Sequence, residues 1–221
     1  MAGGMECLIG MKFDSFVILA HDNSAGRSVL MMKQDQDKLV RLDDRLGMVV
    51  CGEAGDTAYF GEYIQKNVAL YRVRNGYELS PHAAANFTRL ELAESIRSRS
   101  PQAVNLLLGG FDAKEAKTHL YYLDYLGTMA DVPYGAHGYG SYFTLGTLDR
   151  YHRPDMSEEE GVHLLEKCVR EIQLRFLINL ASFSYYIIST EGFSDRRIIT
   201  VGDIKTADKM TSETPAAMAT S

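Results

Sequence analysis

The stretch that decides the fold is ECLIGMKFDSFVILAHD, residues 6–22. It holds two apolar runs, residues 6–13 and 16–21, which are separated by the polar pair Asp14 and Ser15. Short apolar runs that flank a polar turn are typical of a β-hairpin. The stretch therefore predicts two antiparallel strands.

Downstream of this hairpin, two short strands and then a long helix are expected. The apolar runs at 39–41 and 47–51 predict the strands. The helix is expected to open near Asp56, whose side chain suits an N-cap, and to end at Asn75-Gly76, which favour a left-handed helix end. Its expected buried stripe is Phe60, Ile64, Asn67 or Val68, and Tyr71.

A second helix is expected directly after the first. Ser80 suits its N-cap, Pro81 suits its first turn, and Pro101 stops it. Its expected apolar side consists of Ala83, Phe87, Leu90 and Ile96.

The second half of the chain repeats the pattern of strands followed by helices. Strands are expected at 104–108 and 119–125, a helix at 141–150, and final strands at 183–189 and 197–201. Ser157 and Glu160 have the spacing of a capping box, which predicts the start of a fourth helix. The expected buried stripe of that helix is Val162, Leu165, Val169 and Ile172.

This order predicts an α+β fold. Two antiparallel sheets that pack together, with helices on both outer faces, would bury all of these apolar stripes in a four-layer αββα sandwich. We expect one domain over residues 1–221, with 1–5 as a short N-terminal extension and 203–221 as a polar C-terminal tail.

Composition argues against several classes of function. The net charge of −6 and the pI near 5.5 argue against a nucleic-acid surface. No apolar run reaches the length of a membrane helix, and residues 1–5 lack the features of a secretory signal. The cysteines at 7, 51 and 168 form no C-x-x-C pair, which indicates reduced thiols rather than a zinc site or a disulfide framework. The histidines show no metal-ligand spacing, so neither a metal nor a cofactor is expected.

Several landmarks, in the same order, resemble one protein family. The longest is CGEAGDTAYFGEYIQKNVALYRVRNGYELSPHAAANFTR, residues 51–89. Shorter ones lie at residues 105–112, 137–140 and 148–151. Together with residues 6–22 they resemble the β-type subunits of the 20S proteasome over roughly residues 7–201. The α-type subunits of that family fit less well, because they carry an N-terminal helix before their first strand.

The resemblance also places a catalytic corner on this chain. In active members of the family the mature chain begins with a threonine, which aligns on Glu6. The supporting aspartate and lysine align on Asp22 and Lys38, and Gly52 aligns on the glycine whose amide belongs to the oxyanion hole. The family's serine, second aspartate and second serine align on Tyr139, Phe176 and Asn179.

These replacements predict a corner without catalysis. An N-terminal threonine supplies a hydroxyl nucleophile and a free α-amino base. Glu6 supplies a carboxylate instead, and its nitrogen lies in a peptide bond behind residues 1–5. A buried lysine needs a carboxylate partner, and either Asp22 or Glu6 could provide one to Lys38.

The resemblance implies a non-catalytic structural subunit of the core particle, present in the cytoplasm and the nucleus. Its expected partners are neighbours in the β ring (β3-type and β5-type subunits), α-ring subunits, and β subunits of the opposing ring. By the same resemblance, the helix at 56–74 faces the α ring, and the helices at 141–150 and 158–177 face the opposing β ring.

Two other functional classes stay open on the sequence alone. Cys7 could act as the nucleophile of a free-standing N-terminal-nucleophile hydrolase, provided that residues 1–6 are removed. Alternatively, the chain could be an adaptor outside the proteasome, which would purify as a monomer.

Overall fold

A computed structural model describes residues 6–27, 30–176 and 180–200 of the chain. The predicted extension at 1–5 and the predicted tail at 203–221 lie outside the described residues. None of the described helices combines the length and the apolar character that crossing a membrane would require.

One sheet is built around the predicted hairpin. Strands β1 (Cys7–Lys12) and β2 (Phe16–Asp22) pair antiparallel, with Leu8 opposite His21. Outside β1 lies β10 (Tyr134–Gly138), and outside β2 lies β11 (Ser182–Ser189). The short strands β12 (Gly192–Phe193) and β13 (Arg197–Thr200) both pair with β11 and complete this six-stranded sheet.

The second sheet is a five-stranded antiparallel meander in the order β5-β6-β7-β8-β9. Its strands are β5 (Leu39–Asp43), β6 (Leu46–Gly52), β7 (Val104–Asp112), β8 (Lys117–Leu123) and β9 (Met129–Asp131). A separate ribbon, β3 (Ala25–Arg27) and β4 (Leu30–Lys33), links the two sheets in sequence.

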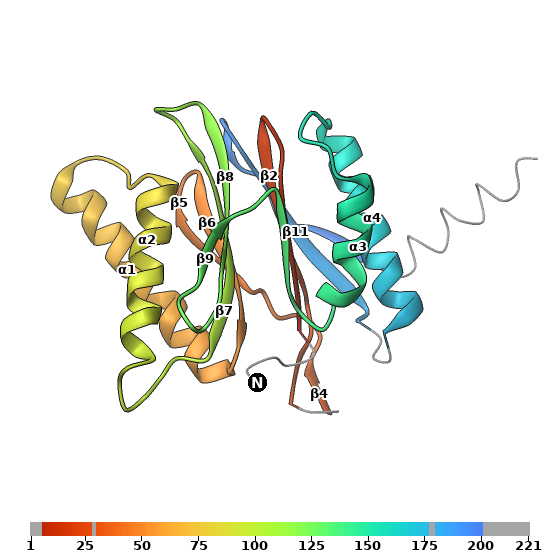
Figure 1. Cartoon of the computed structure of the whole chain (residues 1–221), viewed down its shortest axis with the longest axis horizontal. Helices are drawn as coiled ribbons and strands as arrows, with labels where there is room; N and C mark the ends of the chain where they lie inside the picture. Colours follow the sequence, from red (N-terminus) through yellow and green to blue (C-terminus); the bar gives the residue numbers. More distant parts are fainter. Residues whose placement is uncertain (1–5, 28–29, 177–179, 201–221) are drawn as a thin grey trace, which may run out of the picture.

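In the described part of the chain, four helices cover the outer faces of the sheets. Helices α1 (Ala54–Asn75) and α2 (Pro81–Ser95) lie on the second sheet, while α3 (Ser141–Tyr151) and α4 (Glu158–Arg175) lie on the first. Figure 1 shows the resulting order of layers: a helix pair, two sheets face to face, and a helix pair. The predicted α+β architecture with two antiparallel sheets is confirmed.

Among the described residues, three apolar clusters hold these layers together. The cluster under α3 and α4 includes Phe16, Leu165 and Ile172, and the cluster under α1 and α2 includes Ile64, Leu92 and Leu106. The third cluster lies between the sheets and includes Leu8, Leu19, Val49, Leu107, Leu120 and Ile188. The sheets are therefore joined by their own side chains, and both of their faces are buried.

Several local predictions are confirmed. Ser80 accepts a hydrogen bond from the Ala83 N–H at the start of α2, and Ser157 and Glu160 form the reciprocal capping box of α4. Gly76 ends α1 in the left-handed conformation (φ 77°). The helix at 141–150 corresponds to α3 with one additional residue.

Two predictions about the first helix pair are wrong. Helix α1 begins at Ala54, two residues before Asp56, and its N-cap is Glu53. The Asp56 carboxylate instead accepts the N–H of Ala103. On α2 the buried face consists of Pro81, Ala84, Ala85, Thr88 and Leu92, whereas Leu90 is 50% exposed. Small residues let this face of α2 approach the sheet closely. The prediction relied mainly on larger apolar side chains and therefore did not identify this face.

His137 forms a buried contact between the two sheets. Its ring on β10 stacks on Tyr122 of β8, with ring centroids 4.1 Å apart, and its Nε2 lies 3.0 Å from the carbonyl oxygen of Leu106 on β7. The side chain is buried, and burial lowers the pKa of His137 to about 4. The folded chain therefore holds the neutral imidazole.

We expect this histidine to make the fold sensitive to mild acid. Because the folded pKa lies below the unfolded value, its stabilising contribution is complete above pH 6.5 and is lost as the pH falls from 6.5 toward 4. The loss amounts to about 3 kcal/mol. Urea unfolding of wild type and His137→Gln across this range would measure it, since glutamine keeps a donor and does not titrate. Equal pH slopes for the two proteins would contradict the prediction.

Candidate functional site

The ends of four strands meet at one corner between the sheets. Glu6 directly precedes β1, Asp22 ends β2, Lys38 directly precedes β5, and Gly52 ends β6. The first pair of strands belongs to one sheet and the second pair to the other. The fold therefore brings together residues that lie up to 46 positions apart in sequence.

Lys38 lies between two carboxylates at this corner. Its Nζ is 2.8 Å from Asp22 Oδ1 and 3.1 Å from Glu6 Oε1. The side chains of Lys38 and Asp22 are only 4% and 0% exposed. Burial alone would lower the pKa of Lys38, but the nearby charges of Asp22 and Glu6 raise it above its ordinary value. The predicted ion pair is present, and both candidate carboxylates take part in it.

Backbone amides fix the second carboxylate of the corner. Asp22 Oδ1 accepts the N–H of Cys7 at 2.7 Å, and its Oδ2 accepts the N–H of Ser24 at 3.0 Å. With Lys38 as a third donor, this fully buried carboxylate has a partner for each oxygen. These bonds satisfy the buried carboxylate oxygens within the protein.

Glu6 also accepts a hydrogen bond from the backbone amide that the resemblance assigns to the oxyanion hole. Its Oε2 accepts the N–H of Gly52 at 2.9 Å, while its other oxygen faces Lys38. Gly52 has φ +142°, and a Cβ at this position would lie 2.0 Å from the Ala103 carbonyl oxygen. Only glycine fits this backbone, so the direction of the donor is set by the fold. The sequence did not predict this contact.

The aligned serine and aspartate positions hold aromatic residues. The rings of Tyr139 and Phe176 stack with centroids 6.3 Å apart, and Phe143 contacts Phe176 at 6.1 Å. Within the described part of the chain, no hydrogen bond joins Tyr139 or Phe176 to Glu6, Asp22 or Lys38. Asn179, the third residue predicted for this group, lies outside the described residues.

Cys7 points away from the corner. Its side chain is 0% exposed and belongs to the apolar cluster under α3 and α4. A Cβ on Gly140 would lie 2.0 Å from its Sγ, which places the sulfur tightly against α3. Burial raises the pKa of the Cys7 thiol well above its ordinary value. A neutral, enclosed thiol is a poor nucleophile, so the geometry does not favour the alternative that relies on Cys7.

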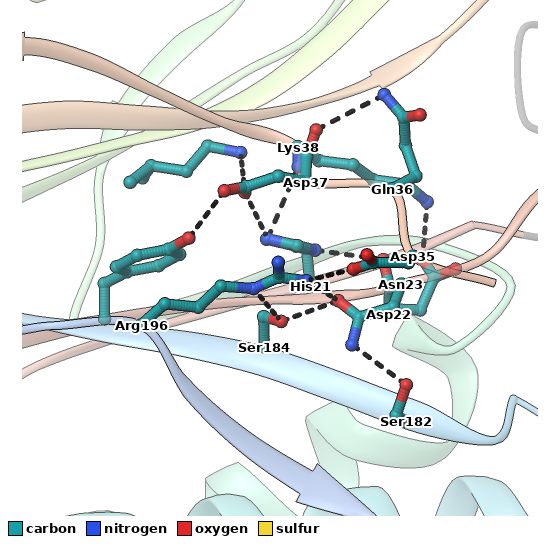
Figure 2. A network of polar contacts seen from close by, with 12 residues as sticks. His21, Asp22, Asn23, Asp35, Gln36, Asp37, Lys38, Ser182, Ser184 and Arg196 are labelled. Atoms are coloured by element: carbon teal, nitrogen blue, oxygen red, sulfur yellow. Dashed lines mark hydrogen bonds and ion pairs between the residues drawn. The ribbon is translucent and has the colours of Figure 1, made fainter.

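A polar network supports the segment that carries Lys38 (Figure 2). Asp37 accepts the Tyr186 hydroxyl at 2.7 Å and the Leu39 N–H at 3.0 Å, and it lies 3.0 Å from Nε2 of buried His21. Burial alone would raise the pKa of Asp37, but these hydrogen bonds hold it below its ordinary value. Asp37 therefore ties the start of β5 to β2 and β11.

A second part of the same network holds the turn after β2. Arg196 donates to Ser184 at 2.8 Å and pairs with Asp35 at 3.1 Å, and Asn23 donates to Ser182 at 2.9 Å (Figure 2). These bonds connect β11 and the segment before β13 with the residue after β2 and with the segment before β5. The segments that carry the Lys38 ion pair are therefore held in place by a hydrogen-bond network.

An acidic cluster elsewhere lies among arginine side chains. Asp43, Asp44 and Glu78 bring carboxylate oxygens within 4.8 Å of one another. However, Arg72 pairs with Asp43, and Arg45 pairs with Glu78 at 3.2 Å. These arginines compete with any cation for the carboxylates of Asp43 and Glu78, which disfavours a metal centre.

Comparisons with known proteins match this chain to the family that its sequence resembles. A family model described as "Proteasome subunit" matches residues 1–188. The chain is 45% identical over 188 residues to "Proteasome subunit beta type-4" of Saccharomyces cerevisiae, covering 85% of this chain and 95% of that protein. It is 48% identical over 188 residues to "Proteasome subunit beta type-2-B" of Arabidopsis thaliana, with 85% and 94% covered. It is 44% identical over 190 residues to "Proteasome subunit beta type-2" of Dictyostelium discoideum, with 85% and 95% covered.

Proposed function

Because this chain belongs to the proteasome subunit family, as a β-type subunit, we propose that it is a non-catalytic structural subunit of the 20S core particle. Its fold would then be the N-terminal-nucleophile hydrolase fold, in the four-layer αββα form. Its work would be to occupy one place in the β ring and to help enclose the chamber in which other subunits cleave proteins.

The observation that carries this proposal is the state of Glu6. A carboxylate lies where a nucleophilic hydroxyl would be needed, and both of its oxygens are engaged, one by Lys38 and one by Gly52. The Glu6 nitrogen lies in a peptide bond, so no α-amino base is available at this residue. The donors that would stabilise a developing oxyanion are therefore already used by a resident negative charge.

The proposal includes a specific place in the assembly. By family resemblance, this place would be the fourth position of the β ring, with β3-type and β5-type subunits as neighbours. By family resemblance, α1 would face the α ring, and α3 and α4 would face the opposing β ring. Cys7, Cys51 and Cys168 are free thiols, which suits the reducing cytoplasm and nucleus.

Purification through this chain tests the proposal. We expect a tagged chain to purify in a particle with α-type and other β-type subunits, as native mass spectrometry would show. An epoxyketone probe, which needs an N-terminal hydroxyl or thiol and a free amine, should label other subunits and leave this chain unlabelled. Its intact mass should show that Glu6 is still joined to Cys7.

Two results would contradict the proposal in different ways. A monodisperse monomer in a lysate rich in proteasomes would favour an adaptor outside the particle. A mature chain that begins at Cys7 and reacts with the probe would favour a hydrolase that uses the cysteine, despite its burial in the present structure.

A further inference from the structure

The Glu6 side chain is bound in the manner of a small ligand. One oxygen accepts the Gly52 N–H at 2.9 Å, and the other lies 3.1 Å from Lys38 Nζ. We propose that Gly52 and Lys38 form a binding site for a small monocarboxylate, which Glu6 fills in the native chain and which acetate would fill once the Glu6 side chain is removed.

The amide donor of this site does not depend on Glu6. Gly52 ends β6 opposite Val104 of β7, and the next residue, Glu53, donates its N–H to the Ala103 carbonyl oxygen at 3.1 Å. The backbone at Gly52 is therefore held against β7 of the second sheet. Truncation of Glu6 would leave this N–H in place, unpaired and directed at the vacated volume.

The cationic donor is also held independently. Asp22 lies 2.8 Å from Lys38 Nζ, and Asp22 is itself fixed by the N–H groups of Cys7 and Ser24. Without Glu6, the ammonium group would keep this partner and would not need to move into solvent. The two donors would thus keep their relative positions, which is the condition for a preorganised anion site.

Size and charge define the class of ligand. Truncation of glutamate to alanine removes Cγ, Cδ and both carboxylate oxygens, and these are the heavy atoms of acetate. Asp22 already carries one negative charge beside Lys38, so a dianion such as phosphate or sulfate would be repelled more strongly than a monoanion. The Glu6 side chain is 22% exposed, which gives a solute access from the surface.

Hydrogen exchange of the Gly52 amide in Glu6→Ala tests the proposal directly. In assembled particles, we expect its exchange to be about 10- to 100-fold faster than in wild type, the range that corresponds to loss of a charge-assisted hydrogen bond. Sodium acetate should slow it again in a saturable way, with half-saturation in the millimolar range. Residue-resolved mass spectrometry over peptides that contain Gly52 provides the measurement.

Matched proteins and salts separate this effect from general stabilisation. Sodium chloride and sodium phosphate at equal ionic strength should leave the exchange of Glu6→Ala unchanged. Wild type and Glu6→Gln should not respond to acetate, because a side chain already fills the site. Glu6→Gly should respond as Glu6→Ala does, which gives a second test if one variant does not assemble.

Three outcomes would overturn the proposal: unchanged Gly52 exchange in both truncated variants, no effect of acetate on either, or an equal effect on wild type. Truncated particles that assemble without binding acetate would refute the carboxylate site alone and leave the proposed structural role standing, since assembly depends on the outer surfaces of the subunit.

Discussion

Replacing Lys38 by methionine is expected to lower the free energy of unfolding by about 3–5 kcal/mol. The variant leaves Asp22 fully buried and Glu6 largely buried, with no cation between them. Both carboxylates keep backbone donors, but two negative charges then share one poorly hydrated corner. Methionine fills the volume of the lysine stem and cannot replace its charge, so the cost is mainly electrostatic.

Lys66→Met provides a matched control for this prediction. Lys66 forms an ion pair with Glu62 at 2.7 Å, but the two side chains are 73% and 67% exposed on α1. Exposed pairs of this kind contribute little to stability, because solvent and salt screen their charges. Urea unfolding and the yield of assembled particles should therefore separate the two variants clearly. Normal assembly of Lys38→Met with loss of peptidase activity would contradict a purely structural role for Lys38.

Some parts of the fold could be predicted because their signals are local. The β1–β2 hairpin follows from two apolar runs and a polar turn, and the start of α4 follows from the spacing of Ser157 and Glu160. Each of these features depends on residues within a few positions of one another. Side-chain pattern and backbone chemistry agree there, so a single segment is sufficient evidence.

Other elements could not be predicted because their reasons are tertiary. Strands β9 and β10 are short and flank Pro133, so they lack the length and the alternation of a recognisable strand. The buried face of α2 uses alanines and Thr88, because the sheet approaches closely there. A pattern based on large apolar residues selected Leu90 instead, and Leu90 is half exposed.

The corner shows the same division between local and tertiary information. Family resemblance placed Glu6, Asp22, Lys38 and Gly52 together, and the need of a buried lysine for a carboxylate predicted their ion pair. The hydrogen bond from the Gly52 N–H to Glu6 depends on the orientation of one peptide at the end of β6. No residue type reports that orientation, so the sequence alone could not reveal how Glu6 fills the corner.

Gly138→Ala is expected to destabilise the fold by more than about 4 kcal/mol, a loss found only for severe structural conflicts. Gly138 pairs with Cys7 across β10 and β1 and has φ +79°. A Cβ at this position would lie 1.8 Å from the carbonyl oxygen of Glu6 and 2.8 Å from its carbonyl carbon. Because these are backbone atoms, no side-chain rotation can relieve the overlap, and β1 would have to separate from β10.

Two further glycines allow the causes to be separated. Gly76 has nearly the same conformation (φ +77°), but a Cβ there meets no atom within 4 Å, so Gly76→Ala measures the conformational cost alone, roughly 1–2 kcal/mol. Gly146 on α3 is also open but has an ordinary helical conformation, so Gly146→Ala should stabilise the chain by about 0.5–1 kcal/mol. Urea unfolding should therefore give a free energy of unfolding that is highest for Gly146→Ala, lower for Gly76→Ala and lowest for Gly138→Ala.

The contact between β1 and β10 would then account for most of the loss of stability in Gly138→Ala. Glu6 would lose its position beside Lys38 when that contact breaks. A Gly138→Ala protein as stable as Gly76→Ala would show that β1 can shift without loss, and that the corner is less rigid than its hydrogen bonds indicate.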